Sequence, residues 1–269
     1  MRFSAASVWE SETMTYYLDS HAHIISEEFR EDFDAVLERA DQADVKRIMI
    51  MCTEEKEIEP ALELVRRDPF RFQCAYGIHP EDADRWESRW DRFLEIIQDP
   101  LISCVGEIGL DYHWVKDNKE VQQELFIRQI EAARQVRKPI LVHSRDAMQD
   151  TYDIMKEHRI PGVMHCFAGS AEMAQEFTKL GYYLAFGGAI TFKNSRHSKE
   201  AAAAVDTKYL LSETDCPYMS PEPVRGRRNE PSNIPHIVKV IADVCGKSEE
   251  EMADIIAENY DRLLHEEVK

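Results

Sequence analysis

Short apolar runs alternate with amphipathic segments along most of this chain. The runs are apolar throughout, which is typical of strands that are covered on both faces, as in parallel sheets. The sequence predicts eight such strands, over Tyr17–Ser20, Arg47–Cys52, Gln73–Gly77, Ile102–Glu107, Ile140–His143, Gly162–His165, Tyr182–Phe186 and Tyr209–Glu213.

The segments between these runs carry apolar residues at helical spacing, as Val36, Leu37 and Ala40 do. We predict helices over Phe33–Ala43, Trp90–Ile97, Glu120–Val136, Ala147–Glu157 and Ala171–Leu180, and two more after the last strand, over Pro235–Cys245 and Glu249–Leu264. Ser248 and Glu251 form a capping box at the start of the last helix. Ala201–Ala204 is a short helix-forming run only.

Repeated strand–helix units imply parallel strands joined by right-handed crossovers. Eight units in roughly 250 residues favour an α/β fold with a single (β/α)8 TIM-type barrel and extra C-terminal helices. The alternative is an open doubly wound sheet, which would carry a Gly-rich turn where this chain has His21-Ala22-His23. We therefore predict one barrel domain over residues 15–269. Residues 1–14 are predicted to be a disordered or tag-like extension, with Met14 as an alternative start.

Composition narrows the classes of function and compartment. The formal net charge of −18 argues against a protein that coats nucleic acid with a basic surface, although Arg225-Gly226-Arg227-Arg228 is a local basic cluster. No apolar run approaches the roughly 18 residues of a membrane span, and no secretory signal is apparent. The six cysteines are scattered without a C-x-x-C motif, which predicts reduced thiols and a cytoplasmic protein.

Six of the eight predicted strands end in histidine or carboxylate residues. In a (β/α)8 barrel these ends meet at one face, where catalytic groups gather. A single histidine at a strand end is usually an ordinary packing or surface residue, but the coincidence of six polar ends indicates a metal centre. The predicted ligands are His21, His23, Glu107, His143, His165 and Asp215.

Four imidazoles and two carboxylates are sufficient for two divalent ions. Glu107 is the predicted bridge, because its two oxygens can be divided between ions roughly 3.5–4 Å apart. The adjoining first and eighth strands would complete one site with His21, His23 and Asp215, and His143 and His165 would complete the other. Such imidazole-rich sites favour zinc, manganese, cobalt or nickel over magnesium.

With these residues assembled, the chain resembles the TatD family of metal-dependent deoxyribonucleases, which are amidohydrolase-type barrels. The matching motifs run in order along nearly the whole chain: Asp19-Ser20-His21-Ala22-His23, Gly77-Ile78-His79-Pro80, Gly106-Glu107-Ile108-Gly109-Leu110-Asp111, His143-Ser144-Arg145, His165-Cys166-Phe167-Ala168-Gly169, Glu213-Thr214-Asp215-Cys216-Pro217-Tyr218 and Arg228-Asn229-Glu230-Pro231. The resemblance implies a barrel that hydrolyses phosphodiester bonds of DNA, often from the 3′ end, with the six ligands named above. It also implies dependence on magnesium, so the identity of the activating ion stays open.

The hypothesis that follows is hydrolysis by a metal-bridged hydroxide, formed from a water between the two ions, which attacks phosphorus in line. Asp215 would accept a proton from the water, and His79 would bind a phosphate oxygen or protonate the leaving group. The predicted substrate-binding residues are Arg145, Arg225, Arg227 and Arg228, and Asp19 is predicted to orient a ligand imidazole.

The expected partner is DNA, as single strands or 3′ ends, with no membrane and no obligate protein partner. One alternative keeps the metals but cleaves an ester or amide, as a lactonase, phosphotriesterase or aminoacyl-tRNA deacylase does. Many such barrels bridge their metals with a carboxylated lysine on the fourth strand, and Ile102–Asp111 contains no lysine. A second alternative is a metal-stabilised interaction protein.

Overall fold

The computed structural model describes residues 15–114 and 116–268. The predicted extension over residues 1–14 lies outside the described residues. Eight parallel strands form one sheet in the order of the sequence, which confirms the predicted TIM-type barrel. The strands are β1 (Tyr17–Ala22), β2 (Val45–Cys52), β3 (Phe72–Tyr76), β4 (Ile102–Asp111), β5 (Ile140–Arg145), β6 (Gly162–Met164), β7 (Tyr183–Phe186) and β8 (Leu210–Ser212).

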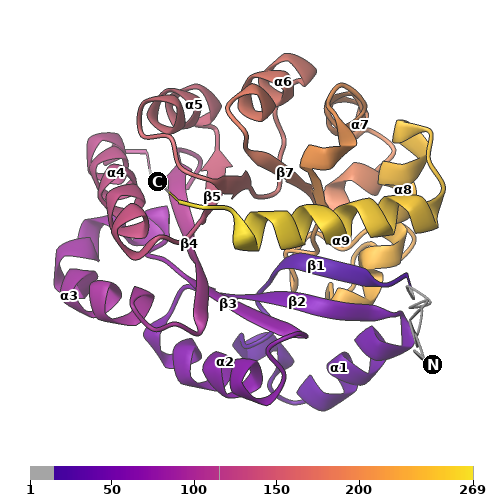
Figure 1. The fold of residues 1–269 in the computed structure, drawn as a ribbon, viewed down its shortest axis with the longest axis horizontal. Coiled ribbons are helices and arrows are strands. Elements are labelled where there is room, and N and C mark those ends of the chain that lie inside the picture. The colour runs from indigo at the N-terminus through magenta and orange to yellow at the C-terminus, as the bar shows by residue number, and fades with distance from the viewer. Residues whose placement is uncertain (1–14, 115, 269) are drawn as a thin grey trace, which may run out of the picture.

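The helices surround the strands and cover their outer faces (Figure 1). They are α1 (Phe33–Gln42), α2 (Glu55–Arg67), α3 (Trp86–Ile97), α4 (Lys119–Val136), α5 (Met148–Glu157), α6 (Ala171–Lys179), α7 (Arg196–Ala203), α8 (Ile234–Cys245) and α9 (Glu249–His265). Strand residues are buried at nearly every position, because helices pack outside and facing strands pack inside. This two-sided burial is the reason that the runs are apolar rather than alternating. No helix in the described residues is long and apolar enough to cross a membrane.

The barrel closes where the two ends of the sheet meet. Ala22, the last residue of β1, bridges to Cys216 beyond β8, and the backbone N–H of Asp215 donates to the carbonyl of His21 at 2.9 Å. The hydroxyl of Ser212 donates to the carbonyl of Leu18 at 3.0 Å. The closure therefore places the polar residues of β1 directly beside those that follow β8.

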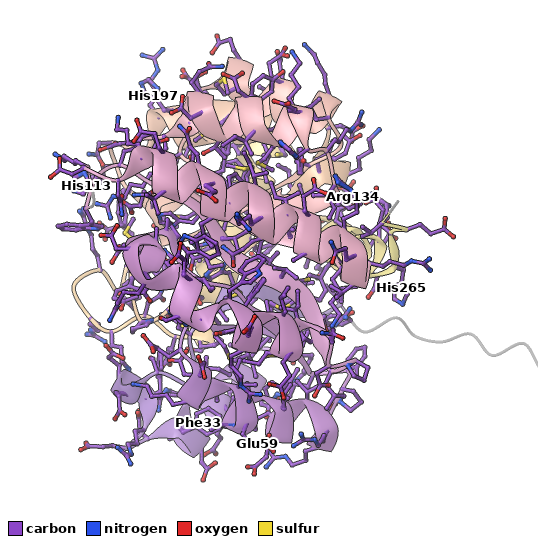
Figure 2. All side chains as sticks on the ribbon, turned by 90° about the vertical axis from the view of Figure 1, so that its left-hand side faces the viewer. Phe33, Glu59, His113, Arg134, His197 and His265 are labelled. Atoms are coloured by element: carbon purple, nitrogen blue, oxygen red, sulfur yellow. The ribbon has the colours of Figure 1, made fainter. Side chains whose placement is uncertain are left out.

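Helix α9 covers the amino-terminal ends of the strands. Its Tyr260 hydroxyl donates to Gln73 at 3.0 Å, and its Asn259 side chain donates to the carbonyl of Leu210 at 2.8 Å. Figure 1 shows this helix, in yellow, lying across the barrel beside β1. Figure 2 shows His265, at the end of α9, and His113, in the loop after β4, on opposite sides of the molecule. Helix α9 therefore covers the end of the barrel opposite to the one at which the carboxyl ends of the strands lie.

Candidate metal centre

A cavity of about 570 Å³ lies at the carboxyl ends of the strands. This volume falls in the range of small-molecule sites. Its lining includes His23, His79, Glu107, Asp111, Trp114, His143, Arg145, His165, Asp215 and Tyr218. Five of the six predicted ligands therefore line one cavity, and the sixth, His21, is buried directly behind it with 1% of its surface exposed.

The two histidines at the end of β1 converge, as their spacing on an extended strand requires. The Nε2 atoms of His21 and His23 lie 3.2 Å apart. Glu107 Oε2 is 3.5 Å from the first and 3.6 Å from the second. Asp215 Oδ1 is 3.8 Å and 3.6 Å from the same two nitrogens. We call these four side chains the first donor set.

The other oxygen of Glu107 faces a second group of imidazoles. Its Oε1 lies 2.8 Å from His143 Nδ1, 3.5 Å from His165 Nε2 and 3.7 Å from His79 Nε2. We call Glu107, His143, His165 and His79 the second donor set. His79, predicted from the sequence as a catalytic residue, is thus also placed within reach of a metal bound at this set.

Asp215 is held in position by its backbone. Its φ of 55° is left-handed, a conformation that is costly for a residue other than glycine and is found mostly where the surrounding structure enforces it. The hydrogen bond from its N–H to the His21 carbonyl fixes it against β1. The carboxylate therefore faces the first donor set and also lies 3.9 Å from His165 Nε2.

The spacing of these atoms fits a metal ion. Ligand atoms held 2.0–2.1 Å from one tetrahedral ion lie roughly 3.3 Å apart, and the first donor set spans 3.2–3.8 Å. His21 Nδ1 is buried without a hydrogen-bond partner among the described residues, so no contact holds this ring through its other nitrogen. Nitrogen and oxygen donors that point at a common centre are the donor types of zinc, manganese and cobalt sites.

The electrostatics of this centre also favour a bound cation. Burial raises the pKa of Glu107, but the adjacent His165 and His21 lower it more, and the pKa lies well below its ordinary value. Burial lowers the pKa of His143, whereas hydrogen bonds to Asp111 and Glu107 raise it, and the resulting pKa is about 9. The raised pKa of His143 shows that these carboxylates favour a positive charge beside them, which a divalent cation would supply.

Comparison with known proteins places the chain in a family. The model of the TatD-related DNase family matches residues 18–265. The chain belongs to this family. It is 41% identical over 249 residues to the metal-dependent hydrolase YabD of Bacillus subtilis, covering 91% of this chain and 97% of that protein. It is 34% identical over 258 residues to the metal-dependent hydrolase YcfH of Escherichia coli, covering 93% and 96%.

A solved structure gives the same fold. The TatD homologue YJJV of E. coli superimposes with a TM-score of 0.81 at 29% identity, covering 92% of this chain and 97% of that one. The chain is therefore a metal-dependent hydrolase of the TatD family, with an amidohydrolase-like barrel and buried clusters of histidine and carboxylate residues.

Two carboxylates of this TatD-family centre were not assigned a role from the sequence. Asp111 Oδ2 lies 2.9 Å from His143 Nε2, and Glu213 Oε1 lies 3.0 Å from His165 Nδ1. Asp111 contacts His143 through the nitrogen that faces away from Glu107, which fixes the orientation and the tautomer of that ring. His165 Nδ1 makes no hydrogen bond among the described residues, so Glu213 acts on this ring through its charge. Both stand in the strand-end motifs, so a search for carboxylates beside the predicted histidines could have found them.

Asp19 is fully buried, and the hydrogen bonds of its carboxylate among the described residues go to backbone and hydroxyl groups rather than to an imidazole nitrogen. Its carboxylate accepts hydrogen bonds from the backbone and the hydroxyl of Thr214, and from the backbone N–H of His21 at 3.3 Å. Burial raises the pKa of Asp19 to about 7. This side chain joins the strand ends of β1 and β8, and so positions His21 through its backbone.

Of the four arginines predicted to bind substrate, one lines the cavity and three lie outside its lining. Arg145 lines the cavity, and its guanidinium lies 5.2 Å from the centre of the Trp114 ring. Arg228 donates to both oxygens of Asp32, at 2.8 and 2.7 Å, and Arg225 lies over Phe192. Arg225 and Arg227 are exposed, and neither they nor Arg228 lines the cavity.

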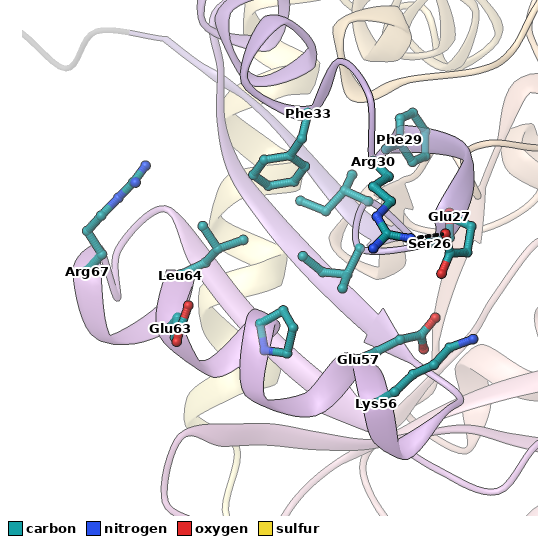
Figure 3. Close-up of a pocket in the computed structure, with 13 residues that line it drawn as sticks. Ser26, Glu27, Phe29, Arg30, Phe33, Lys56, Glu57, Glu63, Leu64 and Arg67 are labelled. Atoms are coloured by element: carbon teal, nitrogen blue, oxygen red, sulfur yellow. Dashed lines mark hydrogen bonds and ion pairs between the residues drawn. The ribbon is translucent and has the colours of Figure 1, made fainter.

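A second cavity of about 600 Å³ adjoins the first between the loop after β1 and helix α2. Ser26 and Glu57 line both cavities. Figure 3 shows these two residues at one end of the second cavity and Arg67 at the other. The space at the strand ends therefore continues sideways toward α2.

Proposed function

We propose that the chain is a divalent-metal-dependent deoxyribonuclease that removes nucleotides from the 3′ end of DNA. The observation that carries the proposal is the position of Glu107. It is 4% exposed at the floor of the cavity, and its two oxygens face two different donor sets. A shared carboxylate between two donor sets is the arrangement of hydrolases that act on phosphate esters with paired ions. The description of the family model supports DNA as the substrate.

Two ions held by these residues would acidify a water and neutralise the phosphate oxygens. Asp215 would accept the proton of the attacking water, because its carboxylate faces the first donor set, 3.8 Å from His21 Nε2 and 3.6 Å from His23 Nε2. Burial raises the pKa of Asp215, but His165 and His23 lower it more, so this carboxylate is ionised. The water oxygen forms the new bond to phosphorus, and the bond from phosphorus to the leaving sugar oxygen breaks.

Two further residues of the cavity would serve the phosphate. Arg145 would pair with a phosphate oxygen, since this residue lines the cavity. His79, 16% exposed in its side chain, would either complete the second donor set or donate a proton to the leaving oxygen. Replacing His79 distinguishes the two roles, because loss of a metal ligand lowers the metal content of the protein, whereas loss of a proton donor does not.

The test uses the metal-reconstituted full-length chain and a single-stranded DNA oligonucleotide labelled at either end. We expect the 3′-labelled strand to lose its label as a mononucleotide and the 5′-labelled strand to give a ladder. EDTA should stop both reactions. Asp215→Asn should abolish cleavage, whereas Asp243→Asn, on the exposed face of α8, should not.

Inactivity of the metal-loaded protein on both labelled strands would overturn the proposal and favour an ester or amide substrate. Equal cleavage in EDTA would remove the metal requirement. Substantial activity of Asp215→Asn would contradict the role given to this carboxylate. Release of label first from the 5′-labelled strand would reverse the proposed polarity.

A further inference from the structure

Exposed aromatic side chains gather at the mouth of the cavity. Four large apolar side chains of the described residues are exposed: Phe70, Trp114, Tyr218 and Met219. Three of them, Trp114 at 63%, Tyr218 at 58% and Met219 at 42%, line the cavity that holds both donor sets. Large apolar groups that stay exposed around one site mark a surface that binds a ligand.

Trp114 and Tyr218 stand on opposite walls of this mouth. Trp114 is in the loop after β4, and Tyr218 is in the loop after β8. Because the eight strands follow one another around the barrel, the fourth and the eighth are diametrically opposed. A ligand that lies across the donor sets therefore meets one ring on each side.

Each ring is tied to a different part of the metal centre. The backbone N–H of Trp114 donates to Asp111 Oδ1 at 2.9 Å, and Asp111 Oδ2 contacts His143. The backbone N–H of Tyr218 donates to the carbonyl of Asp215 at 2.9 Å, and the Tyr218 carbonyl accepts from Asn229 at 2.8 Å. The backbone at each of these two residues is thus fixed relative to the atoms that would perform the hydrolysis.

We propose that Trp114 and Tyr218 stack on the two nucleobases that flank the phosphodiester bond to be cleaved. The inference rests on the proposed nuclease function and names the form of its substrate, a strand with unpaired, unstacked bases. Stacking requires free faces of the bases, which a paired and stacked duplex does not offer. The cavity volume of about 570 Å³ also suits the end of one strand rather than a double helix.

The neighbouring charges fit this ligand better than an apolar peptide. Arg145 packs on the Trp114 ring at 5.2 Å and opens into the same cavity, where it can meet the phosphate between the two bases. Carboxylates of the floor would repel that phosphate unless metal is bound. The aromatic pair thus binds the bases, and Arg145 and the metal centre bind the backbone.

The test measures binding separately from catalysis. Metal-loaded Asp215→Asn protein is titrated into a fluorescently labelled single strand, and anisotropy gives the Kd. Adding Trp114→Ala or Tyr218→Ala should weaken binding about 5- to 150-fold each, the equivalent of about 1–3 kcal/mol per stacked base. Phe70→Ala, which removes a 57%-exposed ring outside the cavity, should leave the Kd unchanged.

A strand with abasic residues at its last two positions identifies what the rings contact. We expect the abasic strand to bind the parent protein as weakly as the normal strand binds the alanine variants, with no further loss when both changes are combined. Trp114→Phe should recover most of the affinity. If the alanine substitutions weakened binding of the normal and the abasic strand by the same factor, the stacking proposal would be overturned. An unchanged Kd in both alanine variants would overturn it as well.

The two proposals fail in different ways. If the wild-type chain cleaves no oligonucleotide, the nuclease function fails, whatever the anisotropy shows. If the wild-type chain cleaves a single strand while both alanine variants keep its Kd and its KM, the stacking inference alone fails. Tighter binding of a blunt duplex than of a single strand would also contradict the inference.

Discussion

Asp111 connects the chemistry of the centre to its surface. One oxygen contacts His143 Nε2 at 2.9 Å, and the other accepts the backbone N–H groups of His113 and Trp114, each at 2.9 Å. Burial raises its pKa, but the contact with His143 and these N–H groups lower it to about 2. A permanently ionised Asp111 therefore holds both a candidate ligand and the loop that carries Trp114.

Replacing this carboxylate tests its role. Asp111→Asn should weaken binding of the ion at the second donor set about 10- to 100-fold, because partners that orient a ligand contribute by this amount. Isothermal titration of the metal-free protein with Zn²⁺ measures the change. Asp146→Asn, which removes an exposed partner of His113, is the matched control and should leave the affinity as it is. Unaltered affinity in Asp111→Asn would contradict this role.

A second residue-scale prediction concerns Asp32 and its partner Arg228. The Arg228 guanidinium beside Asp32 lowers the pKa of this carboxyl, burial raises it and Arg39 lowers it, and the resulting pKa is about 2. The folded-state pKa is thus below the ordinary value of 3.8. The stabilisation is complete above pH 4 and is lost as the pH falls toward 2.

Urea unfolding of the wild type and of Asp32→Asn measures this effect. The wild type should be more stable at pH 5, and the difference should shrink between pH 4 and pH 2. Glu27→Gln, which removes an exposed partner of Arg30, should give a much smaller difference. A difference between wild type and Asp32→Asn that does not change over this range would show that the ion pair does not stabilise the fold.

The sequence could predict that the six candidate ligands lie together, because strand ends converge in a barrel, whichever side chains surround them. The supporting carboxylates depend on register, which the sequence does not state. His143 lies opposite Gly109 in the β4–β5 pairing, so Asp111, two residues farther on the same strand, reaches the back of its ring. The ion pair of Arg228 with Asp32 could not be predicted for a similar reason. A basic run says nothing of the acidic Asp32 that another loop brings to it.

At the scale of elements, Gly109 allows β4 and β5 to approach beside the centre. Its φ is 140°, and a Cβ at this position would lie 2.0 Å from the carbonyl oxygen of His143. That contact is with backbone, which cannot move aside as a flexible side chain would. The strand that carries Glu107 therefore depends on glycine to lie against the strand that carries His143.

Gly109→Ala should lower the free energy of unfolding by about 1–3 kcal/mol, because the added methyl group overpacks a rigid contact. It should also weaken metal binding, since His143 must shift. Gly187→Ala is the control, because its Cβ would meet no atom closer than 3.6 Å. Urea unfolding and metal titration measure both effects. Normal stability of Gly109→Ala would show that the two strands separate without cost.

The strands were predicted more completely than the helices. Helix α2 was missed, because its sequence is dominated by charges and contains Pro60, which removes one backbone hydrogen bond. Its buried residues nevertheless recur at helical spacing, with Ile58, Ala61, Leu62 and Val65 on one face. Helix α7 was seen only as an alanine run. Packing against neighbouring elements, rather than local preference, decides these two segments.

At the scale of the whole molecule, metal and fold should stabilise one another. Carboxylates and imidazoles are buried together at the strand ends. An ion that binds only the folded chain shifts the folding equilibrium toward the folded state. At 100 times its Kd, one ion adds about 2.7 kcal/mol, or roughly 5–10 °C in Tm for a chain of this size.

Thermal unfolding with and without Zn²⁺, after removal of metal by EDTA, measures this shift. Glu107→Gln should lose most of it, because the residue contributes an oxygen to each donor set. Asp243→Asn should keep it. An equal rise of Tm in Glu107→Gln would place the stabilising ion elsewhere in the molecule.

The closure of the barrel also sets the order in which the chain can become functional during synthesis. The first donor set joins His21 to Asp215, and the hydrogen bond between their backbones spans nearly the whole sequence. A ribosome-bound chain that ends before β8 has both β1 histidines but lacks the carboxylate that faces them. Hydrolytic competence therefore arises only near the end of translation, and a C-terminal truncation that removes β8 leaves a chain that cannot assemble the centre.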